Sequence, residues 1–109
     1  MQTAIKKTDL QMHVESIANN LTQGIIEPRD DGEEGSAFDW LQDALDIEYI
    51  VNSKREYLGA RVLVAFGGPN IWVDTRRKLV EGYWWGEYAE ASFQDAIGLD
   101  DALSELWSC

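Results

Sequence analysis

The chain has a single cysteine, Cys109, so no disulfide can form within it and a thiolate metal cluster is excluded. It also has a single histidine, His13, with no second histidine or cysteine ligand to complete a transition-metal site. Nucleophilic catalysis requires a nucleophile beside a positioned base, and the only thiol is at position 109. We therefore expect no metal, no cofactor and no enzymatic activity.

Basic residues are scarce as well. Nine Lys and Arg stand against twenty Asp and Glu, which gives a formal net charge of −11. Affinity for nucleic acid phosphates or an anionic membrane comes from Lys and Arg, so direct binding to either is disfavoured. The sequence also lacks the apolar core of a signal peptide and an apolar run of about 18 residues. We expect a cytoplasmic protein with a basic partner.

The composition is that of one globular domain spanning residues 1–109. Hydrophobic residues make up 45% of the chain, and five Trp, four Tyr and three Phe supply the bulk that a small core needs. Apolar residues spaced by three and four predict a helix from Thr8 to Gln23, with Thr8 as cap and Gly24 as stop. Its buried stripe comprises Leu10, Val14, Ile17, Ala18, Leu21 and Ile25.

A second helix is predicted from a cap at Ser36 to Asp46, and a strand-rich region follows it. This helix is expected to bury Phe38, Leu41, Ala44 and Leu45. The strand candidates are IEYIV, ARVLVAF, NIWVD and LVEGYWW, and Thr75–Lys78 connects the last two. Residues 92–107 have helical spacing that Gly98 interrupts. The predicted fold is α+β, an antiparallel meander of three or four strands packed against two N-terminal helices and a broken C-terminal helix.

Carboxylates are concentrated between positions 27 and 48. Asp39, Asp43 and Asp46 have the i, i+4, i+7 spacing that would align them on one face of the second helix, where like charges repel. Such a row can imitate nucleic acid phosphates and attract the Lys/Arg groove of a nucleic-acid-binding protein. A merely solvated acidic face is the alternative. The candidate acidic site comprises Asp30, Asp31, Glu33, Glu34, Asp39, Asp43 and Asp46.

The predicted hairpin of the last two strands has two different faces. One carries Ile71, Val73, Val80 and Trp84. The other carries Trp72, Asp74, Glu81, Tyr83 and Trp85. Only the first face is free of charge, so we assign it to the core and predict a semi-exposed binding patch of Trp72, Tyr83 and Trp85 rimmed by carboxylates. A helix that covers this second face too is the alternative.

Three basic residues, Arg76, Arg77 and Lys78, occupy the predicted tip of this hairpin. One interpretation is that they keep the hairpin soluble. The other is contact with a nucleic acid that a partner already holds.

The strings Gly67–Ile71, Val73–Thr75 and Gly82–Trp85 resemble a block in small acidic proteins of phages and bacterial mobile elements. The resemblance covers about the last half of the chain and implies a genomic neighbourhood of inhibitors of host defence, including anti-CRISPR proteins. On charge and resemblance together, the leading expectation is a stoichiometric inhibitor that binds a nucleic-acid-handling complex such as a CRISPR effector. The alternative is a general protein-interaction module or homodimer that uses the aromatic face.

Overall fold

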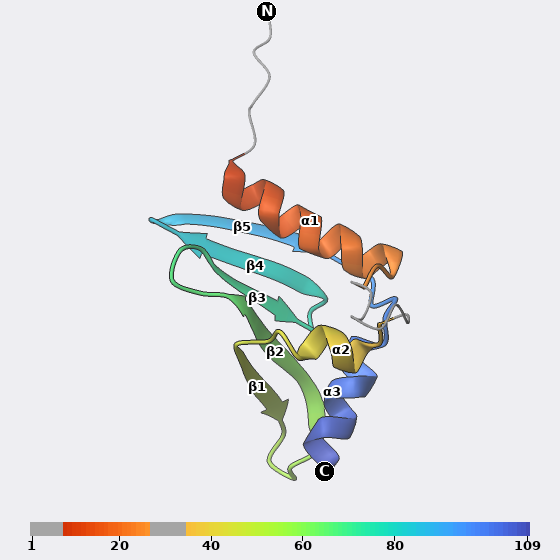
Figure 1. The fold of residues 1–109 in the computed structure, drawn as a ribbon. Helices are drawn as coiled ribbons and strands as arrows, with labels where there is room; N and C mark the ends of the chain where they lie inside the picture. Colours follow the sequence, from red (N-terminus) through yellow and green to blue (C-terminus); the bar gives the residue numbers. More distant parts are fainter. Residues whose placement is uncertain (1–7, 27–34) are drawn as a thin grey trace, which may run out of the picture.

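The computed structural model describes residues 8–26 and 35–109. A helix, α1 (Asp9–Gln23), and a short helix, α2 (Ala37–Leu41), precede five strands, and a third helix follows them. The strands are β1 (Asp46–Val51), β2 (Tyr57–Ala65), β3 (Asn70–Asp74), β4 (Leu79–Trp84) and β5 (Glu87–Ser92), and the last helix is α3 (Leu99–Ser108). The strands form one antiparallel sheet in the order β1-β2-β3-β4-β5, which confirms the predicted α+β meander (Figure 1).

Helix α1 has the predicted bounds because both of its ends are capped. The Thr8 hydroxyl accepts a hydrogen bond from the Gln11 amide, and Gly24 ends the helix with a left-handed φ of 75°. Most of the predicted stripe is buried, whereas Ile17 is half-buried and Ile25 is exposed. Gly82 lets α1 lie close to β4, since a Cβ there would be 2.8 Å or less from side-chain atoms of Leu10 and Val14.

Helix α2 is shorter than predicted. Ser36 and Asp39 form the expected capping box, but the helix ends at Leu41 and the Leu45 amide donates to the Leu63 carbonyl of the sheet. Leu45 and Asp46, which helical spacing alone would place in the helix, therefore pair with β2 instead. Of the apolar positions assigned to this helix, Leu41 is buried and Ala44 half-buried, whereas the prediction was wrong for Phe38 and Leu45, which are exposed.

Strand β5 is an addition to the predicted three or four strands. Its sequence, EYAEAS, has few residues of high β-propensity, yet it pairs in continuous register with β4 from Leu79 opposite Ser92 to Trp84 opposite Glu87. The predicted broken helix therefore begins only after Gly98, and the residues before it end β5 and lead into α3. The side chain of Asp95 caps α3 by accepting from the amides of Leu99 and Asp100 at 2.7 and 2.8 Å.

The helices in the described part of the chain pack on the same face of the sheet. The strand residues of this covered face include Val62, Val73 and Val80, which are opposite one another on β2, β3 and β4 and are fully buried. Helix α1 lies on β4 and β5, and α3 lies on β2. Helix α3 is tied down by Asp100, whose carboxylate accepts hydrogen bonds from Tyr57 and the buried Thr75, and by contact between Trp107 and Tyr49. The opposite face, which we call the open face, carries no helix among residues 8–26 and 35–109.

None of the helices in these residues is long and apolar enough to cross a membrane.

Candidate protein-binding surface

One end of the sheet is rich in exposed aromatic side chains. Since Asn70 of β3 pairs with Tyr83 of β4, the loop between β2 and β3 and the turn between β4 and β5 lie at the same end, as Figure 1 shows. Trp85 is 88% exposed and Phe66 is 73% exposed, and three further aromatic residues at this end are partly exposed, Tyr83 and Tyr88 on the open face and Trp84 on the covered face. We call this surface the aromatic end, and it comprises Phe66, Tyr83, Trp84, Trp85 and Tyr88.

The backbone at Trp85 is in an unfavourable conformation for its side chain. Trp85 and Gly86 form the two-residue turn between β4 and β5, with φ values of 51° and 77°. Two positive φ values are typical of a type I′ turn, in which Asn-Gly is favoured and a bulky residue at the first position costs about 1–2 kcal/mol. Folding thus gains neither burial nor backbone stability from Trp85. A large exposed side chain on a strained backbone makes Trp85 a candidate for a functional contact.

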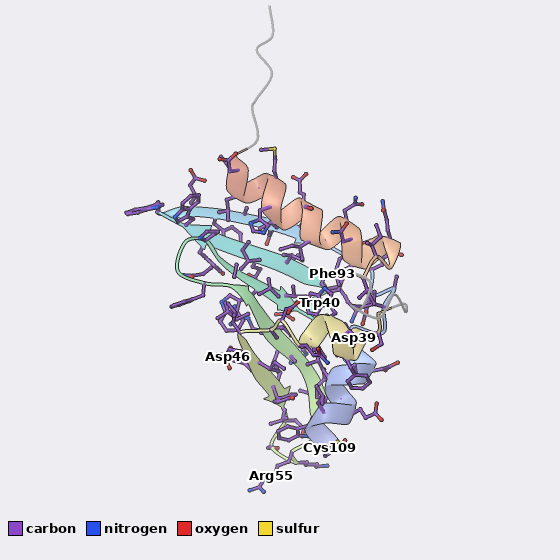
Figure 2. All side chains as sticks on the ribbon, in the orientation of Figure 1. Asp39, Trp40, Asp46, Arg55, Phe93 and Cys109 are labelled. Carbon is purple, nitrogen blue, oxygen red and sulfur yellow. The ribbon has the colours of Figure 1, made fainter. Side chains whose placement is uncertain are left out.

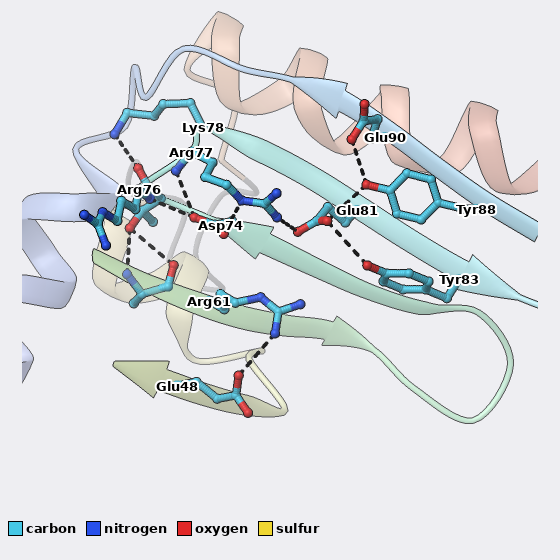
Figure 3. Close-up of polar contacts among 12 residues, drawn as sticks. Glu48, Arg61, Asp74, Arg76, Arg77, Lys78, Glu81, Tyr83, Tyr88 and Glu90 are labelled. Carbon is cyan, nitrogen blue, oxygen red and sulfur yellow. Dashed lines mark hydrogen bonds and ion pairs between the residues drawn. The ribbon is translucent and has the colours of Figure 1, made fainter. Parts of the chain in front are cut away.

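The two tyrosines of the aromatic end are held by carboxylates of the open face. Their rings are paired with centroids 5.0 Å apart. Tyr88 lies 2.7 Å from Glu90 and 3.0 Å from Glu81, and Tyr83 donates to Glu81 over 3.4 Å (Figure 3). Burial raises the pKa of Tyr88, with its hydrogen bond to Glu90 the next cause, and burial followed by the charge of Glu81 raises the pKa of Tyr83. Both hydroxyls stay protonated at neutral pH, so they can donate hydrogen bonds to these carboxylates, and the hydrogen bonds fix the orientation of the rings.

Glu81 is only 4% exposed although it lies on the open face. Arg77 pairs with it and also with Asp74, whose carboxylate is 3.0 Å from the Arg77 Nε. Hydrogen bonds to these two carboxylates raise the pKa of Arg77. The Tyr88 hydroxyl lies between Glu81 and the directly opposite Glu90, and this contact offsets the repulsion of the cross-strand pair.

Two of the three basic residues at the hairpin tip are bound within the domain. Arg77 folds back onto Asp74 and Glu81, and the Lys78 ammonium donates to the Thr75 carbonyl. Asp74 also accepts from the backbone amides of the turn, which fixes its conformation. Two of the three bases thus have partners within the domain.

The predicted aromatic patch is only partly assembled. Trp72 and Tyr83 do lie on the open face, but β4 ends at Trp84, so strand alternation stops there and Trp85 lies in the turn instead. Trp72 is half-buried, with the Arg61 guanidinium carbon 4.5 Å from its ring centroid and Arg61 in turn paired with Glu48 at 3.3 Å. The aromatic surface is centred on the end of the sheet rather than on Trp72.

The predicted acidic row does not form on a helix. Asp39 belongs to the capping box of α2 and Asp46 opens β1 (Figure 2). Asp43 follows the end of α2. The i, i+4, i+7 alignment is therefore wrong, because the helix stops at Leu41. The other four acidic candidates lie outside the described residues: Asp30, Asp31, Glu33 and Glu34.

Sequence reasoning missed Phe66, Trp84 and Tyr88 as members of the surface. The signal was present for two of them, since Gly86 after two tryptophans marks a tight turn and Phe66 directly precedes Gly67-Gly68-Pro69. Tyr88 could be placed only once β5 was known. Among residues 8–26 and 35–109, no group of three or more His, Cys, Asp and Glu side chains is arranged to hold a metal ion.

The fold and this surface together define a small acidic α+β protein in which the helices of the described residues cover one face of an antiparallel meander and one end of the sheet exposes aromatic side chains. Comparison with protein-family models, with curated proteins and with solved structures found no match.

Proposed function

We propose that this protein is a stoichiometric protein-binding protein whose aromatic end inserts into a partner surface. The observation that carries the proposal is Trp85, a tryptophan that is 88% exposed at the tip of a hairpin with a left-handed φ. Large aromatic anchors next to polar groups are typical of interface hot spots. The proposal assigns no reaction to the chain.

The distribution of charge supports a basic partner surface. Residues 79–92, which include most of the aromatic end, contain Glu81, Glu87 and Glu90 and no Lys or Arg. In the described part of the chain, the bases other than Arg61 lie in the turns between β1 and β2 and between β3 and β4, at the opposite end of the sheet. An apolar pocket rimmed by Lys and Arg therefore complements this end, and the net charge of −11 favours the encounter.

A narrower form of the proposal is inhibition of a nucleic-acid-handling defence complex, such as a CRISPR effector. The net charge and the resemblance of the C-terminal half to phage and mobile-element proteins support it. In this form the basic surface that receives the aromatic end belongs to the nucleic acid groove of the complex.

The test is a variant that removes the anchor and keeps the turn. Trp85→Asn leaves an Asn-Gly pair, the preferred type I′ sequence, so we expect unchanged or higher stability by thermal unfolding. Ile25→Asn is the matched control, since Ile25 is 51% exposed and follows α1, whose last turn contacts the chain after β5 at the opposite end of the sheet. Immobilised wild type and Ile25→Asn should retain the same basic protein from a bacterial lysate, released by salt, and Trp85→Asn should not.

Equal retention by Trp85→Asn would overturn the proposal, since the variant keeps the charge and the fold. A wild-type dimer in sedimentation that Trp85→Asn abolishes would instead identify the partner as a second copy of the chain. That outcome would replace the basic partner with the homodimer alternative.

A further inference from the structure

The two edges of the sheet differ in regularity. Pairing of β1 with β2 has a register shift between Ile50 and Val51, whereas pairing of β5 with β4 is continuous over its whole length. A bulge discourages further strand pairing, and a regular edge is a template for it. Strand β5 is therefore the edge suited to accept another strand.

The hydrogen-bonding groups that point outward from β5 follow from its register. Trp84 and Glu87 flank a two-residue turn and so form a hydrogen-bonded pair, and the Phe93 amide still donates to the Lys78 carbonyl at 3.0 Å. The alternation directs the backbone groups of the even-numbered residues away from β4. These outward residues are Tyr88, Glu90 and Ser92.

One contact within the domain already uses this edge. The Gln11 side-chain amide of α1 donates to the Glu90 carbonyl over 3.3 Å. The distance is long for an N–H···O hydrogen bond. A peptide N–H arriving along the edge would replace it with a shorter one.

A groove of about 540 Å³ lies between α1 and the last two residues of β5. Its helix wall is polar, and its residues Glu15 to Thr22 extend roughly 10 Å along α1, the length of about three residues of an extended chain. It is lined by Glu15, Ser16, Ala18, Asn19, Thr22, Ala91 and Ser92.

We propose that the groove between α1 and β5 binds an extended Lys/Arg-containing segment of a partner protein as a sixth strand. Addition of a strand to an edge beside a helix supplies affinity through main-chain hydrogen bonds, and the side chains along the groove supply specificity. The charge complementarity comes from Glu15 on the helix wall and from Glu87 and Glu90 on β5. Tyr88 belongs both to the aromatic end and to this edge, but Trp85 contributes neither to the groove nor to the outward edge, so a variant at Trp85 tests the two sites separately.

The probe is a blocked octapeptide of alternating Thr and Lys, titrated into the whole isotope-labelled chain, with an alternating Thr and Glu peptide as charge control. We expect the Lys peptide to shift the amide signals of Ser16 and Asn19 and to slow hydrogen exchange at Tyr88, Glu90 and Ser92. The Glu peptide should bind at least about tenfold more weakly. Absence of binding at millimolar Lys peptide, or binding without protection of these three amides, would overturn the proposal.

Two pairs of variants locate the bound peptide. Ser92→Pro removes an outward N–H and should weaken binding about tenfold, whereas Ser92→Ala keeps that N–H and should bind as the wild type does. Asn19→Arg fills the groove and neutralises the charge of its lining, and Asn20→Arg makes the same change at the exposed neighbour outside the groove lining. If Ser92→Pro does not fold, the affinities of Asn19→Arg and Asn20→Arg for the peptide still test the proposal. Equal affinity of Asn19→Arg and Asn20→Arg would rule the groove out, and Trp85→Asn should bind the peptide normally.

Discussion

Both faces of the sheet carry large side chains, but the two faces are stabilised in different ways. The covered face is a continuous apolar layer in which Val62, Val73 and Val80 follow one another across three strands. On the open face, the row next to it runs from Leu63 through Trp72 and Glu81 to Glu90. Its aromatic rings and carboxylates are connected through Arg61, Arg77 and Tyr88. Side-chain size alone therefore does not distinguish the faces, whereas the positions of the charges do.

Because the two faces differ in burial, an Ile→Ala substitution should lower the free energy of unfolding by different amounts on each. Ile71 is fully buried on the covered face, and Ile71→Ala should lower the free energy of unfolding by about 2–5 kcal/mol. Ile50 is half-buried on the open face of β1, and Ile50→Ala should cost about 1 kcal/mol or less. Urea denaturation of both variants measures the difference. Equal losses would show that a further layer packs on the open face.

The hairpin of β3 and β4 shows how far the sequence alone predicts the fold. The Thr75–Lys78 turn and the assignment of Ile71, Val73 and Val80 to the core are confirmed, because strand alternation and the charge of one face agree. Helix α1 is likewise predictable from its local caps at Thr8 and Gly24. Where local signals agree with the tertiary structure, sequence reasoning succeeds.

The failures occur where tertiary pairing overrides local preference. Residues 42–46 continue a helical pattern, but the helix ends at Leu41 and the chain turns so that Leu45 and Asp46 pair with β2, which removes the predicted acidic row. Strand β5 forms although its alanines and glutamates do not favour a strand, since β4 supplies a partner. The position of Trp85 depends on that pairing, so the aromatic end could be located only in part.

Alkaline pH should reveal how much Tyr83 and Tyr88 of the open face stabilise the folded chain. A raised tyrosine pKa means that the folded chain keeps a proton that the unfolded chain loses, so the stabilisation is complete below about pH 10 and is lost as pH rises through the folded-state pKa. Tyr88→Phe removes one such group, and its melting temperature should fall less steeply than that of the wild type above about pH 10. The effect is smaller than that of Ile71→Ala because Tyr88 is about half exposed.

Tyr57 provides the background for this measurement, since burial and its hydrogen bond to Asp100 also raise its pKa. Both proteins retain Tyr57, so its contribution cancels in the comparison. Identical alkaline slopes for the wild type and Tyr88→Phe would show that the contacts of Tyr88 with Glu81 and Glu90 do not stabilise the folded chain.

The smallest expected effect concerns Arg61, which covers part of Trp72. Arg61→Met keeps a long side chain over the ring and removes the cation, so it should lower stability by about 0.5–1 kcal/mol in urea denaturation. Arg76→Met, at the exposed hairpin tip, is the matched control and should change stability by less than about 0.5 kcal/mol. If the two variants are equally stable, Arg61 does not hold Trp72 within the domain. Trp72 would then be available to a partner, and the binding surface would extend from the aromatic end along the open face.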